Sequence, residues 1–388
     1  MSTAIHGEKK TVLVVDDAPA NVRIVNEILR DTYKVRVATN GAKGIELAAG
    51  TPHPDLILLD VVMPGMDGYE VCSRLKASSF TRDIPVIFLT GQTETSDETR
   101  GFEVGAVDYI RKPFSPAIVA ARVQTHLALR ETRELLERQL LTIRQELETA
   151  REIQMSILPQ TIPVIGGLDI AASYIPMTSV AGDFYDFAVI NDHKIGILVA
   201  DVSGHGMPAA LIASMLKIAF AAESDHAGDP IRVLTGLNQA LYGKFQGHYV
   251  TAAYAVIDTR NQTLCYAGAG HPPLLLRDSD SGVVRRVLEN GLFLGYFPDP
   301  TYSAVEVPFR KGDWLLLYTD GIPEMMNESA EQFGGARLEQ YLKENAAPPA
   351  ADFAAGLLKH LSVWSGQDSG GEPDDDVTLL PVHFLAGE

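Results

Sequence analysis

The sequence predicts a doubly wound α/β unit with a five-stranded parallel sheet, a long helical linker and a layered α+β unit. Five short, nearly wholly apolar runs alternate with amphipathic stretches in residues 1–115, as in parallel sheets covered on both faces. A charged segment with regularly spaced leucines indicates the long helix. Strands and helices then come in blocks, which favours an α+β unit. We therefore expect domains at 1–115, 116–158 and 159–388.

The first unit alternates expected strands and helices along the chain. The expected strands are 11–15, 35–39, 55–60, 85–90 and 106–110, and the expected helices are 19–30, 42–49, 68–77 and 96–104. In such a sheet the carboxyl ends of the strands share one edge, where ligands bind.

The linker has no Pro or Gly between Pro116 and Pro159. Apolar residues follow 3–4 spacing along it: Leu129, Leu136, Leu140, Ile143, Leu147, Ala150 and Ile157. Arg133 and Gln154 fall on the same stripe and make its register imperfect. We favour a parallel coiled coil that forms a homodimer. The alternative is an amphipathic helix that lies on one domain.

The last segment is expected to form a largely antiparallel β-sandwich flanked by helices. Its expected strands are 195–200, 249–257, 262–267, 273–276, 314–318 and 376–384, and its expected helices are 207–222, 231–244 and 351–363.

The composition of the chain argues against several classes of protein. The chain has 388 residues and a formal net charge of −18, so binding to nucleic acid or to an anionic membrane surface is not expected. Cys72 and Cys265 are far apart, which argues against a disulfide framework or a thiolate zinc site. No apolar run is long enough to span a bilayer, and the first residues do not resemble a signal peptide. A cytoplasmic protein is expected.

Polar side chains end or follow four of the five expected parallel strands. They are Asp16, Asp17, Asp60, Thr90 and Lys112. Three carboxylates form a hard oxygen site that suits Mg²⁺, and a hydroxyl and an ammonium can hold phosphoryl oxygens. An isolated Asp after a strand caps a helix about as often as it serves a site, but five convergent groups favour a phosphoryl-transfer site.

Residues 10–125 resemble a two-component response-regulator receiver domain. The matching motifs are VVDDAPAN, LLDVVMPGMDGYE, FLTG and the KPF of 112–114. The resemblance implies phosphorylation by a sensor histidine kinase. The roles it implies are Asp60 as phosphoacceptor, Asp16, Asp17, Asp60 and the Val62 carbonyl as Mg²⁺ ligands, Thr90, Tyr109 and Lys112 as the switch, and a cis bond at Lys112–Pro113.

The last segment contains several aspartate-bearing turns. Asp201 and Asp320 each end an apolar run and precede glycine-containing turns, which is typical of rigid metal ligands. Asp183 lies in GDFYD, and Asp375 in the run DDD. Carboxylates without Cys or paired His favour Mg²⁺ or Mn²⁺ over zinc. Two such ions can lower the pKa of a water and align it with phosphorus. A lone TDG or DDD is more often a solvated turn.

Six motifs in order between Ala150 and Thr378 resemble the SpoIIE/RsbU branch of the metal-dependent PPM protein serine/threonine phosphatases. They are AREIQMSILP, GDFYD, ADVSGHG, AGHPP, TDG and DDxT. The resemblance implies two Mn²⁺ or Mg²⁺ ions. It implies that Asp201 bridges both metals, the Val202 carbonyl binds one, Asp320 and Asp375 hold the other, and Asp183 completes the cluster. The run of aspartates leaves Asp376 as an alternative to Asp375.

His205 and His271 are more readily interpreted as structural histidines than as catalysts, although His205 could position water or protonate the leaving group. The resemblances together imply that phosphorylation of Asp60 controls the phosphatase through the linker. The implied substrate is a phosphorylated anti-anti-sigma (STAS) protein. We expect stimulation, with inhibition left open. The alternative is a non-catalytic module that sequesters a partner protein.

Overall fold

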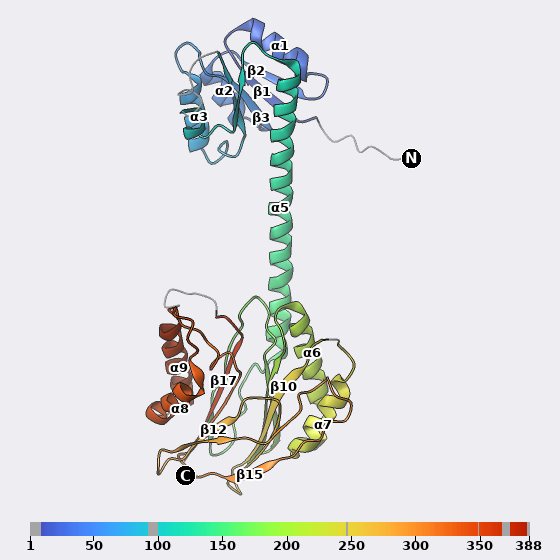
Figure 1. Cartoon of the computed structure of the whole chain (residues 1–388), viewed down its shortest axis with the longest axis vertical. Coiled ribbons are helices and arrows are strands. Elements are labelled where there is room, and N and C mark those ends of the chain that lie inside the picture. The colour runs from blue at the N-terminus through green and yellow to red at the C-terminus, as the bar shows by residue number, and fades with distance from the viewer. Residues whose placement is uncertain (1–8, 92–99, 246, 348, 367–372, 386–388) are drawn as a thin grey trace. The chain divides into compact units, whose positions relative to one another are not determined.

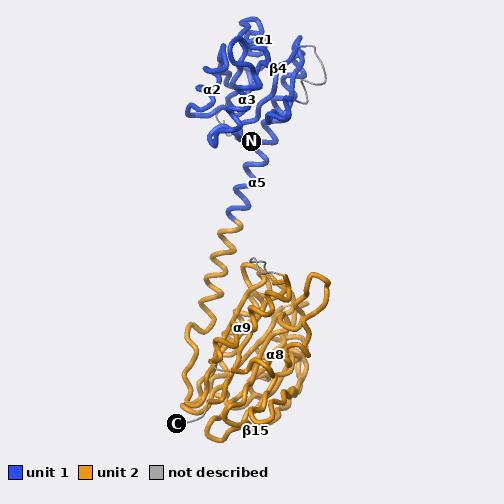
Figure 2. The backbone as a smooth tube through the Cα atoms, turned by 90° about the vertical axis from the view of Figure 1, so that its left-hand side faces the viewer, with its two compact units in different colours: residues 1–142 blue, residues 143–388 orange. Residues whose placement is uncertain are grey.

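The structure is a computed structural model that describes residues 9–91, 100–245, 247–347, 349–366 and 373–385. The chain divides into two compact units, Met1–Thr142 and Ile143–Glu388 (Figure 2). The helix expected at 96–104 lies partly outside the described residues, and 100–103 are helical.

The N-terminal unit is a five-stranded, wholly parallel sheet in the order β2-β1-β3-β4-β5, which confirms the doubly wound prediction. Val12 and Val14 pack on one face with α1 and α5, while Leu13 and Val15 pack on the other with α2 and α3. Strands β1, β3 and β4 are buried on both faces and are therefore almost wholly apolar, whereas the edge strands β2 and β5 also carry charged residues. The elements are β1 Thr11–Val15, α1 Pro19–Leu29, β2 Lys34–Ala38, α2 Gly41–Ala49, β3 Leu56–Asp60, α3 Gly68–Ala77, β4 Val86–Thr90, β5 Asp108–Arg111 and the start of α5 Pro116–Ile157.

Helix α5 contributes to both units. In its first turns Val119, Val123 and Leu127 are buried against the parallel sheet. Near its end Gln154 is buried in the C-terminal unit. Between these points four residues of the predicted stripe are exposed: Leu129, Leu136, Leu140 and Ile143.

The C-terminal unit contains two six-stranded sheets whose facing sides form one core. The first sheet contains β8 Phe184–Asn191, β9 Lys194–Val202, β10 Val250–Asp258, β11 Thr263–Ala269, β14 Asn290–Gly291 and β15 Val305–Pro308. The second contains β6 Leu168–Ile170, β7 Ser173–Ile175, β12 Leu274–Arg277, β13 Val284–Val287, β16 Trp314–Tyr318 and β17 Val377–Phe384. Their pairings are antiparallel except for the short β11–β14 pair.

Helices cover the outer faces of these sheets. Helices α6 Met207–Ala222 and α7 Pro230–Leu241, with the 3₁₀ turn Ser224–His226, lie on the flank of the first sheet (Figure 1). Helices α8 Gly334–Asn345 and α9 Ala350–Ser365 lie on the flank of the second.

Strand β16 shows why this sandwich is stable. Leu315 and Leu317 face the core between the sheets, whereas Trp314, Leu316 and Tyr318 pack with α8 and α9. The period-2 alternation of a strand thus places apolar side chains in both layers. The layered α+β prediction is confirmed. None of the helices in the described part of the chain has the length and apolarity that a membrane span requires.

Candidate functional site

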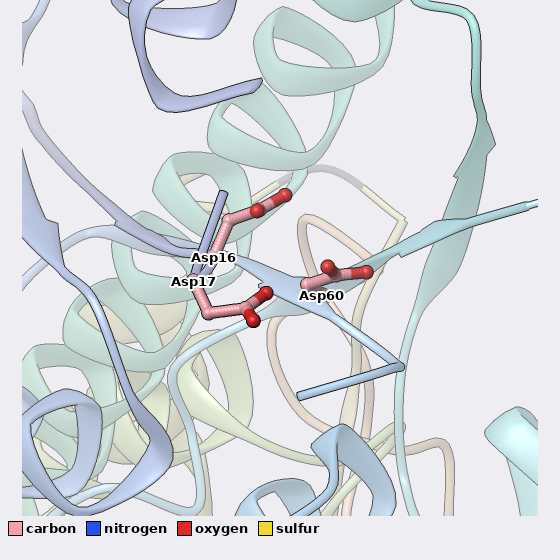
Figure 3. A group of neighbouring side chains, drawn as sticks. All are labelled: Asp16, Asp17 and Asp60. Atoms are coloured by element: carbon pink, nitrogen blue, oxygen red, sulfur yellow. The ribbon is translucent and has the colours of Figure 1, made fainter. Parts of the chain in front are cut away.

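The parallel sheet brings three carboxylates together at its carboxyl edge. Asp16 and Asp17 follow β1, and Asp60 ends the neighbouring strand β3. Their ligand atoms lie within 4.8 Å of one another (Figure 3). The donor set consists of hard oxygens from two buried carboxylates and one exposed carboxylate, which fits Mg²⁺. We call Asp16, Asp17, Asp60 and Lys112 the receiver cluster.

Lys112 places a positive charge inside the receiver cluster. Its Nζ lies 3.0 Å from Asp16 Oδ2 and 2.8 Å from Asp60 Oδ2. Burial raises the pKa of Asp60 above its ordinary value, and the charge of Asp16 adds to this rise, while the hydrogen bond from Lys112 opposes it. Asn21 donates to both oxygens of Asp16 at 3.1 and 3.0 Å and fixes that carboxylate.

The remaining predicted receiver residues lie around the same edge. Thr90 ends β4, and together with Tyr109 it lines a small cavity of about 10 Å³. Tyr109 contacts Phe102 edge to face, with ring centroids 6.3 Å apart. Val62 has an exposed side chain two residues beyond Asp60. The Lys112–Pro113 peptide bond is cis, as the resemblance predicts.

In the C-terminal unit the predicted metal ligands come from strand ends of both sheets. Asp201 lies on β9 and Asp183 immediately precedes the adjacent strand β8. Asp320 follows β16, and Asp375 precedes β17, the strand paired with β16. We call Asp183, Asp201, Asp320 and Asp375 the C-terminal cluster.

Burial, and after it repulsion between neighbouring carboxylates, raises the pKa values in the C-terminal cluster. Burial raises the pKa of Asp201 to about 8, with the charges of Asp320 and Asp375 as the next largest causes. Burial and the charge of Asp375 raise the pKa of Asp320 to about 6. Among the described residues, Asp16, Asp17 and Asp60 are the only set of three or more such side chains whose ligand atoms all lie within 4.8 Å of one another, so the C-terminal carboxylates are more widely spaced. Divalent cations stabilise carboxylates that repel one another, and hard oxygen donors suit Mn²⁺ or Mg²⁺, so these residues fit either ion.

Two threonines that the sequence analysis did not single out hold Asp183. The hydroxyls of Thr319 and Thr378 both donate to Asp183 Oδ2, at 2.7 and 2.6 Å. The backbone N–H of Thr378 donates to Thr319 Oγ1 at 2.9 Å, which links β16 to β17. Burial raises the pKa of Asp183, and the charge of Asp201 adds to this rise. Both threonines adjoin motif aspartates, in TDG and DDxT, and this position is the signal that could have identified them.

The structure separates the three consecutive aspartates by environment. Asp376 is buried, and its two oxygens accept from the backbone N–H groups of Met177 and Gly182, at 2.7 and 2.6 Å. Asp375 is exposed and accepts from the N–H of Asp376 at 2.8 Å. A Cβ at Gly321 would lie 2.0 Å from the Asp376 carbonyl oxygen, so the TDG turn requires glycine there. Asp376 therefore fixes the loop before Asp183.

The two motif histidines have different surroundings. His205 is exposed in the turn after Asp201. His271 is buried, and burial lowers its pKa to about 4. Its Nε2–H donates to the Tyr318 carbonyl at 3.0 Å, so Nδ1 accepts from the Thr251 hydroxyl at 2.9 Å. Thr251 pairs with Asp201 in the first sheet, and Tyr318 ends β16 two residues before Asp320. Neutral His271 therefore connects the strand end that carries Asp201 to the strand end that precedes Asp320.

Gln154, which disturbs the stripe of α5, contacts the loop before Asp183. Its Nε2 donates to the Ala181 carbonyl at 2.6 Å, and its Oε1 accepts from the Ala181 N–H at 3.0 Å. The end of the linker helix is thus bonded to a backbone segment two residues from the C-terminal cluster.

The parallel sheet with three carboxylates and a lysine at its edge is typical of a receiver domain. The two-sheet sandwich with aspartates at its strand ends is typical of a PPM-type phosphatase domain. The chain belongs to the SpoIIE family, because the model of Stage II sporulation protein E matches residues 191–385. The response regulator receiver domain model matches residues 12–124. PPM phosphatases are metal-dependent as a family.

Curated relatives match one part of the chain or the other. A protein of Vibrio cholerae named "Probable cyclic di-GMP phosphodiesterase" is 44% identical over 126 residues, 32% of this chain and 28% of its own. Phosphoserine phosphatase RsbP of Bacillus subtilis is 32% identical over 245 residues, 62% of this chain. Phosphoserine phosphatase RsbU of the same organism is 32% identical over 239 residues, 61% of this chain and 70% of RsbU. The chain spans 58% of RsbP, so it covers less than two thirds of the first two relatives.

A solved structure supports the fold of the C-terminal unit. The SiaA-PP2C domain of Pseudomonas aeruginosa superposes with a TM-score of 0.57 at 27% identity. The match covers 63% of this chain and 98% of that domain.

Proposed function

We propose that the chain is a response regulator in which phosphorylation of Asp60 controls a Mn²⁺- or Mg²⁺-dependent protein serine/threonine phosphatase. The observation that carries the proposal is the C-terminal cluster, where carboxylates from the strand ends of two sheets raise the pKa values of Asp201 and Asp320. Asp201, the Val202 carbonyl, Asp320 and Asp375 would hold two ions, with Asp183 beside them. Such ions, when bound, lower the pKa of a water and neutralise charge on the phosphoryl group.

The chain's own residues keep these ligands in place. Thr319 and Thr378 orient Asp183, and the buried carboxylate of Asp376 holds the preceding loop. Neutral His271 ties the strand of Asp201 to the strand that leads to Asp320. Positions fixed in this way reduce the reorganisation needed during the reaction.

The proposed substrate is a phosphorylated STAS anti-anti-sigma protein, and a sensor histidine kinase is the proposed source of phosphate for Asp60. Support for the substrate comes from the likeness to the phosphoserine phosphatases RsbP and RsbU. The test incubates the full chain and Mn²⁺ with phosphorylated STAS proteins from the same genome, with and without beryllofluoride. We expect phosphate release to increase with beryllofluoride. Absence of release from these proteins and from p-nitrophenyl phosphate would instead favour the non-catalytic binding module.

We propose that α5 carries the signal, because Gln154 bonds it to the backbone of Ala181. Replacing Gln154 with Ala should make phosphatase activity independent of beryllofluoride. Gln145→Ala is the matched control, since Gln145 is an exposed glutamine of the same helix. A beryllofluoride response equal to that of the wild type in the Gln154 variant would rule out this contact as the coupling element.

We also propose that α5 forms a homodimeric coiled coil, because Leu136 and Leu140 of its apolar stripe are exposed in the single chain. Sedimentation analysis of Leu136→Glu/Leu140→Glu should show a shift from dimer to monomer. Leu135→Glu/Leu141→Glu, which changes exposed leucines off the stripe, is the control. An equal shift in both variants would argue against the proposed register.

A further inference from the structure

An exposed aromatic patch lies on the C-terminal unit, composed of Tyr249, Leu292, Phe293, Tyr296 and Phe297. The centroid of the Phe293 ring lies 4.3 Å from that of Tyr249 and 5.4 Å from those of Tyr296 and Phe297. Tyr296 is 56% exposed, Leu292 48% and Tyr249 37%. Contiguous apolar surface of this kind marks interaction sites more often than isolated exposed residues do.

The aromatic patch is bonded directly to the loop that follows Asp201 and Val202. The N–H of Ser203 donates to the Tyr249 carbonyl at 2.9 Å, and the N–H of Tyr249 donates to Ser203 Oγ at 2.8 Å. The ring Nδ1–H of His248 donates to the Ser203 carbonyl at 2.7 Å. The patch therefore begins beside the segment that carries two of the proposed metal ligands.

A second backbone pairing places the other rings next to Tyr249. Val250 and Leu294 exchange two hydrogen bonds, 3.1 Å from the N–H of Val250 and 2.8 Å from that of Leu294. Tyr249 and Phe293 each adjoin one member of this pair, and their rings contact each other. A Cβ at Gly270 would lie 3.2 Å from Phe293 Cβ, so Phe293 also packs on the residue before His271. The patch is continuous with the strand ends that form the C-terminal cluster.

Buried groups hold the aromatic patch in a fixed conformation. Asn238 of α7 accepts from the N–H of Gly295 at 2.8 Å and donates to the Phe297 carbonyl at 3.0 Å. Gly295 has φ of +83°, and a Cβ there would lie 2.7 Å from the Phe245 ring. Rings held in this way lose little conformational entropy when a partner covers them.

We propose that the aromatic patch docks the folded phosphoprotein whose phosphoserine or phosphothreonine enters the C-terminal cluster; this rests on the function proposed above. A protein that presents its phosphorylated residue to Asp201 must also cover the surface beside Ser203. The net charge of −18 disfavours nucleic acid or an anionic membrane as the occupant. The partner surface that fits has aliphatic or aromatic side chains next to the phosphorylated residue.

The test compares kcat/KM for a phosphorylated STAS protein with kcat/KM for p-nitrophenyl phosphate, which is too small to reach the patch. In Leu292→Ala/Tyr296→Ala the ratio of the two values should fall about tenfold or more, mainly through KM. Tyr296→Phe keeps the ring and should retain the wild-type ratio. Val283→Ala, at an aliphatic position that is 58% exposed, is the control. Thermal melting verifies that each variant is folded.

Each other outcome has a distinct meaning. An unchanged ratio in the double variant overturns the docking proposal and leaves the phosphatase proposal intact. Wild-type turnover of p-nitrophenyl phosphate without turnover of any phosphorylated STAS protein overturns that substrate, and docking of it, but not the chemistry. Absence of both activities overturns the proposed function itself.

Discussion

The chain contains two carboxylate clusters that balance their charge in different ways. In the receiver cluster, Lys112 lies within 3.0 Å of both Asp16 and Asp60. In the C-terminal cluster, the charges that most strongly raise the pKa of Asp201 are those of other carboxylates, Asp320 first. In the receiver cluster, a lysine of the chain itself therefore neutralises part of the negative charge. The C-terminal cluster depends more heavily on cations from outside, and the following predictions test this difference.

The largest expected effect is on catalysis by the C-terminal cluster. Asp201→Asn should lower kcat/KM for p-nitrophenyl phosphate with Mn²⁺ by about a thousandfold, equivalent to about 4 kcal/mol. The variant should be at least as stable as the wild type in EDTA, because it removes a partly buried carboxylate that its neighbours repel. Asp374→Asn, at an exposed position in the run of three, is the control. Equal activity in the two variants would contradict the proposed role of Asp201.

Divalent cations should stabilise the two units unequally. Mn²⁺ at a hundred times its Kd for the C-terminal cluster should add about 2.7 kcal/mol to the free energy of unfolding of that unit. At the same concentration the receiver unit should gain less, because Lys112 already compensates its carboxylates. Calorimetry with Mn²⁺ and with EDTA measures the two transitions. A larger rise in the unfolding temperature of the receiver unit than of the C-terminal unit would contradict this comparison.

Loss of the internal cation should destabilise the receiver unit. Lys112→Met should lower its free energy of unfolding by about 2 kcal/mol, since Asp16 and Asp60 would face each other uncompensated. Lys43→Met removes an exposed lysine paired with Glu46 and should cost less than about 1 kcal/mol. Urea unfolding of both variants measures the difference. Similar losses would show that Lys112 acts as an ordinary surface charge.

The smallest expected effect is a pH dependence at His271. Its pKa is lowered from 6.5 to about 4 in the folded protein, so below pH 6.5 the unfolded chain binds a proton that the folded chain does not. Stability from this residue is complete above pH 6.5 and is lost as the pH falls toward 4, by about 1.4 kcal/mol per unit. Urea unfolding of wild type and His271→Gln between pH 7 and 5 isolates this slope, since other titrating groups are shared. Parallel curves would refute it.

Elements with strong local patterns were predictable from the sequence. Strands β1 and β3 are buried on both faces and are therefore continuously apolar, which identifies them without tertiary information. Strand β14 has two residues and β6 has three, so neither provides a measurable period, and both were missed. Helix α8 was also missed, because it begins with two glycines and buries only two side chains.

Sequence motifs identify the aspartates of both clusters. Metal and phosphoryl chemistry requires carboxylates in local turns that let the backbone approach the ligand, and such turns have a recognisable sequence. The sequence by itself thus determined the two domain classes, the motif aspartates and the apolar stripe of the linker. Only the tertiary structure showed that Asp376 holds the loop before Asp183 and that Gln154 bonds to the backbone of Ala181. Only the tertiary structure also showed that neutral His271 connects the two sheets. The physical reason is that these roles depend on burial and on backbone partners distant along the chain, which no local pattern encodes.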